Sequence, residues 1–226
     1  MSLLLVAHGT RKQRGVAMVG DLTEQVSATL SRQVHVAFVD VLGPTPSEVL
    51  ASMAQPTIVV PAFLSRGYHV TTDIPAHVAA SGHSDVTVAE ALGPSPQLVR
   101  VVADRLIESG WRRDDSVILA AAGTSDSGAQ RDLHTTATWL SAITGSRVEL
   151  AFAATGTPRV HEAVAALRRR GARRVAVASY LLSEGLFQDR LRASGADVVT
   201  DPLGTHPGLV RLIANRFRRA RVPMAA

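Results

Sequence analysis

The chain of 226 residues contains no cysteine, which excludes disulfides, a thiolate nucleophile and iron–sulfur ligation. Aromatic residues make up only 4% of it, so it lacks the stacking platforms on which single-stranded nucleic acids bind. Its longest apolar runs have the length of strands, which predicts no transmembrane span. The first residues lack a basic n-region and predict a strand rather than a signal peptide. We therefore expect a cytoplasmic protein that binds neither a membrane nor nucleic acid.

Positive charge is unevenly distributed along the chain. The 24 Lys and Arg residues exceed the 19 Asp and Glu residues, which gives a formal net charge of +5. Residues 1–113 carry nine residues of each sign, whereas residues 114–226 carry fifteen basic and ten acidic ones. A basic surface attracts phosphates or a ligand with many carboxylates. Solvated, arginine-rich helix faces are the alternative interpretation.

The sequence repeats itself, and only its first copy has side chains that could bind a metal. Four segments recur at nearly constant offsets: 4–10 near 117–124, 37–40 at 151–154, 63–69 at 181–187, and 92–96 at 203–207. At matched positions three potential ligands are replaced by apolar residues: His8 corresponds to Ala122, Asp40 to Ala154, and His69 to Phe187. This pattern indicates a duplicated scaffold with one active copy. We expect an N-terminal domain over 1–112 that carries the metal site, and a degenerate repeat over 113–226.

Each half alternates strand-like apolar runs with amphipathic stretches, which predicts an α/β fold with parallel sheets covered on both faces. The predicted strands are Leu3–Ala7, Val34–Val41, Thr57–Phe63, Val86–Ala89, Val117–Ala121, Val148–Ala153, Arg174–Tyr180 and Asp197–Thr200. In the first half, helices are predicted over Gly15–Leu30, Pro46–Met53, Asp73–Ala80 and Pro96–Ser109.

The predicted fold brings the potential ligands together. His8 follows the first strand, Asp40 ends the second, and His69 lies in the loop after the third. Ligands of open α/β sheets bind at the carboxyl ends of strands, so these side chains are expected to converge. Two imidazoles and a carboxylate suit Fe²⁺, Co²⁺, Ni²⁺ or Zn²⁺, and three protein ligands leave positions open for a substrate. Asp73 is expected to cap the helix that follows, in a structural role.

Other chemistries are poorly supported. The loop Gly123–Gly128 is not followed by the Lys-Ser/Thr of a phosphate-binding P-loop, and no G-x-G-x-x-G follows a strand, so no nucleotide is expected. A phosphohistidine mechanism requires arginine before the histidine, where this chain has Ala7. His77, on the face of Asp73, and His206, at a turn of the second half, are further candidates for roles around the site.

These motifs resemble the class II chelatases of tetrapyrrole synthesis, the sirohydrochlorin chelatase family, in its long two-domain form. The matching segments are His8–Arg11, Ala37–Asp40, Pro61–Pro75 and Leu92–Pro94, and the similarity extends over essentially the whole chain. The resemblance implies two chelatase-like domains with the active site in the cleft between them. It also implies a lyase that inserts a divalent metal into sirohydrochlorin without ATP.

The resemblance assigns residues to roles. It implies that His8 and His69 are catalytic and bind the metal, and that Asp40 assists where the family commonly has Glu. Loop residues of the same motifs are expected to bind the polycarboxylate substrate: Arg11, Ser65, Arg66, Gly67 and Tyr68. Iron, giving siroheme, is favoured because the chain lacks a His-rich tract. Cobalt insertion for cobalamin, nickel insertion, and a metal- or tetrapyrrole-binding protein without turnover remain the alternatives. The two halves are expected to make a pseudo-two-fold monomer.

Overall fold

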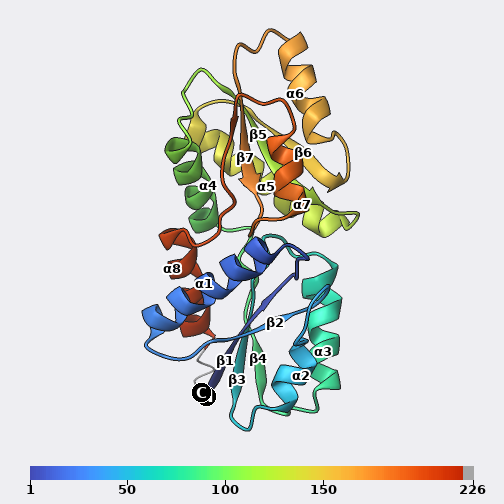
Figure 1. The fold of residues 1–226 in the computed structure, drawn as a ribbon, viewed down its shortest axis with the longest axis vertical. Helices are drawn as coiled ribbons and strands as arrows, with labels where there is room; N and C mark the ends of the chain where they lie inside the picture. The colour runs from blue at the N-terminus through green and yellow to red at the C-terminus, as the bar shows by residue number, and fades with distance from the viewer. Residues whose placement is uncertain (221–226) are drawn as a thin grey trace. The chain divides into compact units, whose positions relative to one another are not determined.

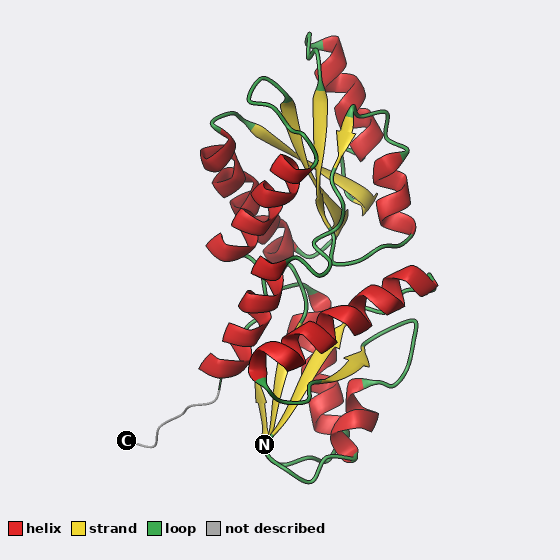
Figure 2. Ribbon diagram, turned by 60° about the vertical axis from the view of Figure 1, so that its left-hand side comes forward, coloured by secondary structure: helices red, strands yellow, loops and turns green. Residues whose placement is uncertain are grey.

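The computed structural model of the chain describes residues 1–220, so the last six residues of the predicted second domain lie outside the described part. It contains two four-stranded parallel sheets, each with helices on both faces, as Figures 1 and 2 show. The predicted α/β class is confirmed. The elements in chain order are β1 (Ser2–Ala7), α1 (Gln13–Leu30), β2 (His35–Phe38), α2 (Pro46–Ala51), β3 (Thr57–Pro61), η1 (His69–Asp73), α3 (Ile74–Ala80), β4 (Val86–Val88), α4 (Pro96–Glu108), β5 (Ser116–Gly123), α5 (Ser127–Thr144), β6 (Val148–Thr155), α6 (Val160–Arg169), β7 (Val175–Tyr180), α7 (Leu186–Arg192), β8 (Val198–Val199) and α8 (Pro207–Arg219).

The first sheet has the strand order β2-β1-β3-β4. Its central strand β1 is a continuous apolar run in which Leu3 to Ala7 are fully buried, as expected for a parallel strand covered on both faces. From β1 the chain passes to β2 on one side, and β3 and β4 then follow on the other side. The topological switch point, where ligands of such sheets bind, therefore lies between the carboxyl ends of β1 and β3.

The chain forms two compact units whose limits differ from the predicted boundary at residues 112 and 113. The first unit combines Met1–Gly93 with the chain from Thr205 onward, and the second unit is Pro94–Gly204. Helix α4 thus packs in the second unit, against α5 and β7, while α8 packs in the first unit, against α1 and β3. The sequence repeats and the compact units therefore differ by the last helix of each repeat.

Both exchanged helices have strongly apolar faces that require a sheet to cover. In α8 the side chains of Leu209, Ile213 and Phe217 are fully buried in the first unit. In α4 the same is true of Leu98 and Leu106 in the second unit. Each such side chain contributes about 1.5–3 kcal/mol when it leaves water, which is enough to fix where the helix packs.

The second unit repeats the first down to individual hydrogen bonds. The Phe38 amide donates to the Pro44 carbonyl (2.9 Å), and in the second copy Phe152 donates to Pro158 (3.0 Å). A serine hydroxyl on the first helix of each copy accepts from a backbone amide at or just before the next strand, as Ser27 does from Val34 (3.0 Å). Ser141 and Val148 make the matching bond at 2.9 Å. The backbone scaffold is therefore duplicated.

Asp197, just before β8, joins three segments of the second unit. Its carboxylate accepts from the Val175 amide (2.7 Å) and from the Arg168 guanidinium (2.7 Å). Both donors favour the charged form, so they lower the pKa of Asp197, with the Val175 amide as the larger cause.

Within residues 1–220 no helix combines the length and the apolar character that crossing a bilayer requires.

Candidate metal and substrate site

The two predicted metal-binding histidines lie at the carboxyl edge of the first sheet. His8 is the residue directly after β1, and His69 begins the π-helical turn η1 after β3. Because β1 and β3 are neighbours in the sheet, both side chains belong to the switch point. Their ring centroids are 5.1 Å apart and the rings are nearly perpendicular, with an interplanar angle of 83°.

The tautomer of His8 follows from its local contact. Its Nδ1 lies 2.7 Å from the carbonyl oxygen of Gly9, which can only accept a hydrogen bond. Nδ1 therefore carries the proton, and Nε2 presents a lone pair. The side chain is 47% exposed, so this nitrogen is accessible to an incoming ion.

His69 is held more firmly. Its Nδ1 lies 2.5 Å from a carboxylate oxygen of Asp73, and its ring packs against Phe63 with 5.6 Å between centroids. The carboxylate accepts the Nδ1 proton, so Nε2 of His69 also presents a lone pair. A carboxylate that orients a histidine in this way is a recurrent feature of metal sites, where it fixes the tautomer and raises ligand basicity.

The prediction that Asp73 caps a helix was wrong. Its side chain makes no capping hydrogen bond to α3, because the turn η1 extends the helical backbone upstream through Asp73. An N-cap residue needs extended backbone angles, whereas Asp73 has φ −67° and ψ −48°. The sequence held a signal for its actual role, since His69 and Asp73 are four residues apart and share a face once the segment is helical.

The geometry of the two imidazoles suits one shared ion. Metals of this class lie about 2.0–2.1 Å from an imidazole nitrogen, so two ring centroids that share an ion are separated by at most roughly 6–6.5 Å. The observed 5.1 Å falls inside that limit. The separation therefore allows both imidazoles to reach one ion, and metal binding by His8 and His69 stays a prediction.

Asp40 lies beside this pair but points partly elsewhere. Its Oδ2 is 3.9 Å from Nε2 of His8, while its Oδ1 accepts from the Val41 amide at 2.6 Å. The side chain is 61% exposed. Over residues 1–220, no group of three or more His, Cys, Asp or Glu side chains is already arranged to hold a metal ion. Direct ligation by Asp40 therefore stays a prediction.

Gly9 fixes the distance between the first two strand ends. A Cβ atom there would lie 2.2 Å from the carbonyl oxygen of Asp40 and 3.1 Å from the Leu42 amide nitrogen. Gly123 in the second copy meets the backbone of Thr155 in the same way. Glycine is therefore required here because the Asp40 loop crosses directly over it.

The predicted substrate-binding residues lie on the two loops that carry the histidines. Arg11 is exposed, in the loop that follows His8. Arg66 and Tyr68 are also exposed, Tyr68 by 61%, and the Tyr68 ring meets His69 edge-on with 6.1 Å between centroids. Gly67 has a structural part as well, because its carbonyl accepts from the Val70 and Thr71 amides and so begins η1. Ser65 is half-buried on the same loop.

Two further histidines have local partners away from this pair. His77 bonds through Nδ1 to the Ser47 hydroxyl on α2, at 3.1 Å. His206 is 7% exposed, and its Nδ1 accepts from the Gly208 amide at the start of α8. His206 therefore caps a helix.

The second copy has lost the whole arrangement. Ala122, Ala154 and Phe187 occupy the sequence positions that correspond to His8, Asp40 and His69. The counterpart of Asp73, at the same offset of 118 as Phe187, is Leu191, which is fully buried.

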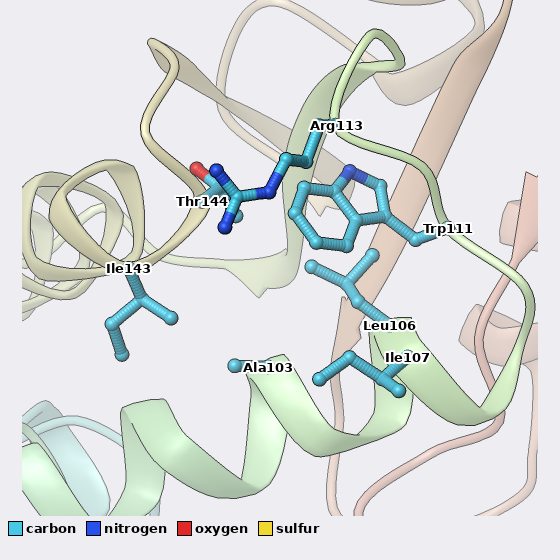
Figure 3. Close-up of a pocket in the computed structure, with 7 residues that line it drawn as sticks. All are labelled: Ala103, Leu106, Ile107, Trp111, Arg113, Ile143 and Thr144. Carbon is cyan, nitrogen blue, oxygen red and sulfur yellow. The ribbon is translucent and has the colours of Figure 1, made fainter.

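A hollow of about 190 Å³ in the second unit contains none of the predicted site residues (Figure 3). Its lining is Ala103, Leu106, Ile107, Trp111, Arg113, Ile143 and Thr144. This set has one cation and no His, Asp or Glu, so it lacks the donors that a metal needs.

Comparison with known proteins agrees with this architecture. A sirohydrochlorin ferrochelatase from Priestia megaterium is 23% identical over 237 residues, covering 96% of this chain and 89% of the relative. A sirohydrochlorin cobaltochelatase from the same organism is 27% identical over 204 residues, covering 84% and 67%. The solved structure of SirB from Bacillus subtilis with Fe³⁺ shares the fold, with a TM-score of 0.83, 21% identity and coverage of 97% and 94%. The CbiX family model matches twice, over residues 2–109 and 116–220, and the chain therefore belongs to the CbiX family.

Proposed function

We propose that the protein is a sirohydrochlorin chelatase, which inserts a divalent metal ion into the tetrapyrrole sirohydrochlorin without ATP. The observation that carries the proposal is the histidine pair: two imidazoles 5.1 Å apart, each with Nδ1 held by an acceptor. Both Nε2 atoms are thereby available to the same ion. The names of the relatives, which act on sirohydrochlorin with iron or cobalt, agree with this chemistry.

The reaction exchanges one set of nitrogen ligands for another. The incoming ion loses water and is held by Nε2 of His8 and His69 on one side of the macrocycle. As pyrrole nitrogens replace the imidazoles, two pyrrole N–H protons must leave. Each released Nε2 is then a base within reach of the ring, and imidazole is suited to proton transfer near neutral pH.

The carboxylates support this exchange in different ways. Asp73 holds the proton on Nδ1 of His69, so that Nε2 stays a ligand and a base throughout. Oδ2 of Asp40 lies 3.9 Å from Nε2 of His8. At this distance the carboxylate can balance the charge of the ion as it passes. Arg11 and Arg66 would pair with peripheral carboxylates of the substrate.

Iron is the metal we favour. Cobalt is the main alternative, because a pair of histidines with a nearby carboxylate suits both ions. Metal supply often decides between such ions in cells.

The test is anaerobic metal insertion followed by absorbance, with Fe²⁺, Co²⁺ and Ni²⁺ in parallel. We expect multiple turnovers with the unmodified protein and their loss in His8→Ala and His69→Ala. His35→Ala is a matched control, because His35 is an exposed histidine at the start of β2, at the opposite end of the sheet. No acceleration over the spontaneous reaction with any of the metals would refute the proposal and favour a binding protein without turnover.

A further inference from the structure

The amino edge of the second sheet, where its parallel strands begin, carries a dense group of arginines. Eight of them lie in the segments that lead into β5, β6 and β7 and at the end of α6, at positions 112, 113, 147, 168–170, 173 and 174. The same region holds four carboxylates: Asp114, Asp115, Glu149 and Asp197. At the end of α4, Arg105 and Glu108 pair with each other at 2.8 Å and add no net charge. This edge therefore accounts for most of the formal net charge of +5.

The arginines of the amino edge fall into two groups. Three are neutralised by carboxylates, in the pairs Arg168–Asp197 (2.7 Å), Arg170–Glu149 (2.6 Å) and Arg174–Asp115 (3.5 Å). The other five are exposed and make no ion pair within residues 1–220: Arg112, Arg113, Arg147, Arg169 and Arg173. Like charges gathered on one surface attract a ligand of the opposite sign.

Hydrogen bonds join the separate segments of the amino edge into one surface. Arg174 donates through Nη2 to the Gly110 carbonyl (3.2 Å), and the Ser116 amide donates to the Arg174 carbonyl (3.0 Å). Arg168 donates through Nη1 to the Arg173 carbonyl at 3.1 Å. The turns before β5 and β7 and the end of α6 are thereby held together, so the fold sets where these arginines lie.

The apolar hollow of about 190 Å³ opens beside these cations, and Arg113 is part of its lining. Ile107 in the last turn of α4 and Ile143 in the last turn of α5 line it from two sides (Figure 3) and are 65% and 49% exposed. The Thr144 hydroxyl donates to the Leu140 carbonyl at 3.1 Å, which leaves the Arg113 guanidinium as the donor for a ligand. An apolar cavity of about 150 Å³ holds benzene, so this hollow has room for one large apolar side chain.

We propose that the amino edge of the second sheet binds an acidic segment of a partner protein, which places one large apolar side chain in the hollow and its carboxylates against the five exposed arginines. Protein interfaces combine an apolar anchor in a pocket with polar residues around it, and arginine is enriched there. Nucleic acids need stacking platforms, which a chain with 4% aromatic residues lacks. The apolar side chains here line a hollow, whereas membrane binding needs a continuous apolar face. The inference does not depend on the proposed function.

The test uses a short fluorescein-labelled peptide of glutamates and aspartates with one central phenylalanine. It is titrated with the intact protein and followed by fluorescence anisotropy, beside a reference peptide that has alanine in place of the phenylalanine. We expect the phenylalanine peptide to bind about tenfold more tightly, as for an anchor side chain in a pocket. Arg113→Glu should raise its Kd about tenfold and weaken the dependence on salt. Ile143→Ser should raise it about fivefold and remove the preference for phenylalanine.

Two control variants make the result specific. Arg131→Glu reverses an exposed cation near the start of α5, at the other end of the helix that carries Ile143. Leu186→Ser removes an apolar side chain that is 54% exposed at the start of α7. Both are expected to bind the phenylalanine peptide like the unmodified protein.

Four results would each overturn the inference. They are no binding of the phenylalanine peptide, equal Kd values for the two peptides, an effect of Arg131→Glu as large as that of Arg113→Glu, and tighter binding of a single-stranded oligonucleotide or of phosphatidylserine vesicles than of the peptide. None of them bears on metal insertion, which is measured separately.

Discussion

Asp73 offers a sharp test of how the histidine pair is set up. Its carboxylate lies 2.5 Å from Nδ1 of His69, and the two side chains are 24% and 33% exposed. A hydrogen bond to a charged group contributes about 1.5–3 kcal/mol, and partial exposure places this one near the lower end. A loss of about 1.5 kcal/mol corresponds to roughly tenfold in an equilibrium or rate constant. That agrees with the 10–100-fold effects typical of residues that orient metal ligands.

We therefore expect Asp73→Leu to lower kcat/KM for metal insertion by about 10–100-fold and to weaken Co²⁺ binding similarly. Without the carboxylate, Nδ1 has no acceptor, and the proton can move to Nε2 and remove the ligand lone pair. Asp73→Asn keeps an acceptor oxygen and should lose less, about 3–10-fold. Initial rates and Co²⁺ titrations measure both effects.

The control for Asp73 is Asp85→Asn, which removes an exposed carboxylate just before β4, at the other end of the same sheet. It should leave both measurements unchanged. Affinity for metal-free sirohydrochlorin should also be unaffected by Asp73→Leu, because Asp73 acts through His69. Wild-type metal affinity and kcat/KM in Asp73→Leu would refute the assignment of Asp73 as a positioning residue.

Three further predictions concern the scaffold. Gly9→Ala places a methyl group 2.2 Å from the Asp40 carbonyl, and should cost about 1–3 kcal/mol in urea unfolding and slow insertion. Gly20→Ala, in an open part of α1, should instead be neutral or stabilise by up to about 1 kcal/mol. Because the folded state lowers the pKa of Asp197, its contribution is present above about pH 4 and is lost as the pH falls further. Asp197→Asn should therefore flatten the acid limb of a stability-against-pH curve, and an unchanged limb would contradict this. Phe217→Ala should cost about 3–5 kcal/mol, with hydrogen exchange rising first in α1 and β3, against which α8 packs.

The strands were predictable because each is a short apolar run with no competing interpretation. Most predicted limits, such as Leu3–Ala7 against the observed Ser2–Ala7, agree within one or two residues. The second strand is shorter than predicted, ending at Phe38, because the chain turns at Asp40 and Val41 takes a positive φ of 70°. Such a conformation is rare for a β-branched residue and leaves no trace in a hydrophobic pattern.

The exchange of α4 and α8 was not predictable from the sequence. An amphipathic pattern states that a helix has a face to bury, but not which sheet will cover it. The repeat suggested that each half would cover its own sheet. The linking segments at Gly93 and Gly204, where the compact units divide, carry the chain to the other sheet instead. Only the three-dimensional packing contains that information.

The duplication separates residues needed for the fold from those needed for chemistry. The copies share backbone hydrogen bonds such as Phe38 to Pro44 and Phe152 to Pro158, although the second lacks the counterparts of His8, Asp40, His69 and Asp73. The site residues should therefore contribute little to folding.

A variant of the first copy can carry the residues of the second: His8→Ala, Asp40→Ala, His69→Phe and Asp73→Leu together. His8 and Asp40 are exposed and His69 and Asp73 half-buried, so at about 0.5 kcal/mol each the four substitutions should lower the melting temperature by no more than about 8 °C. Insertion and Co²⁺ binding should both be abolished. A variant that unfolds would show that the site is part of the scaffold, and the loss of activity in single variants could then not be assigned to chemistry alone.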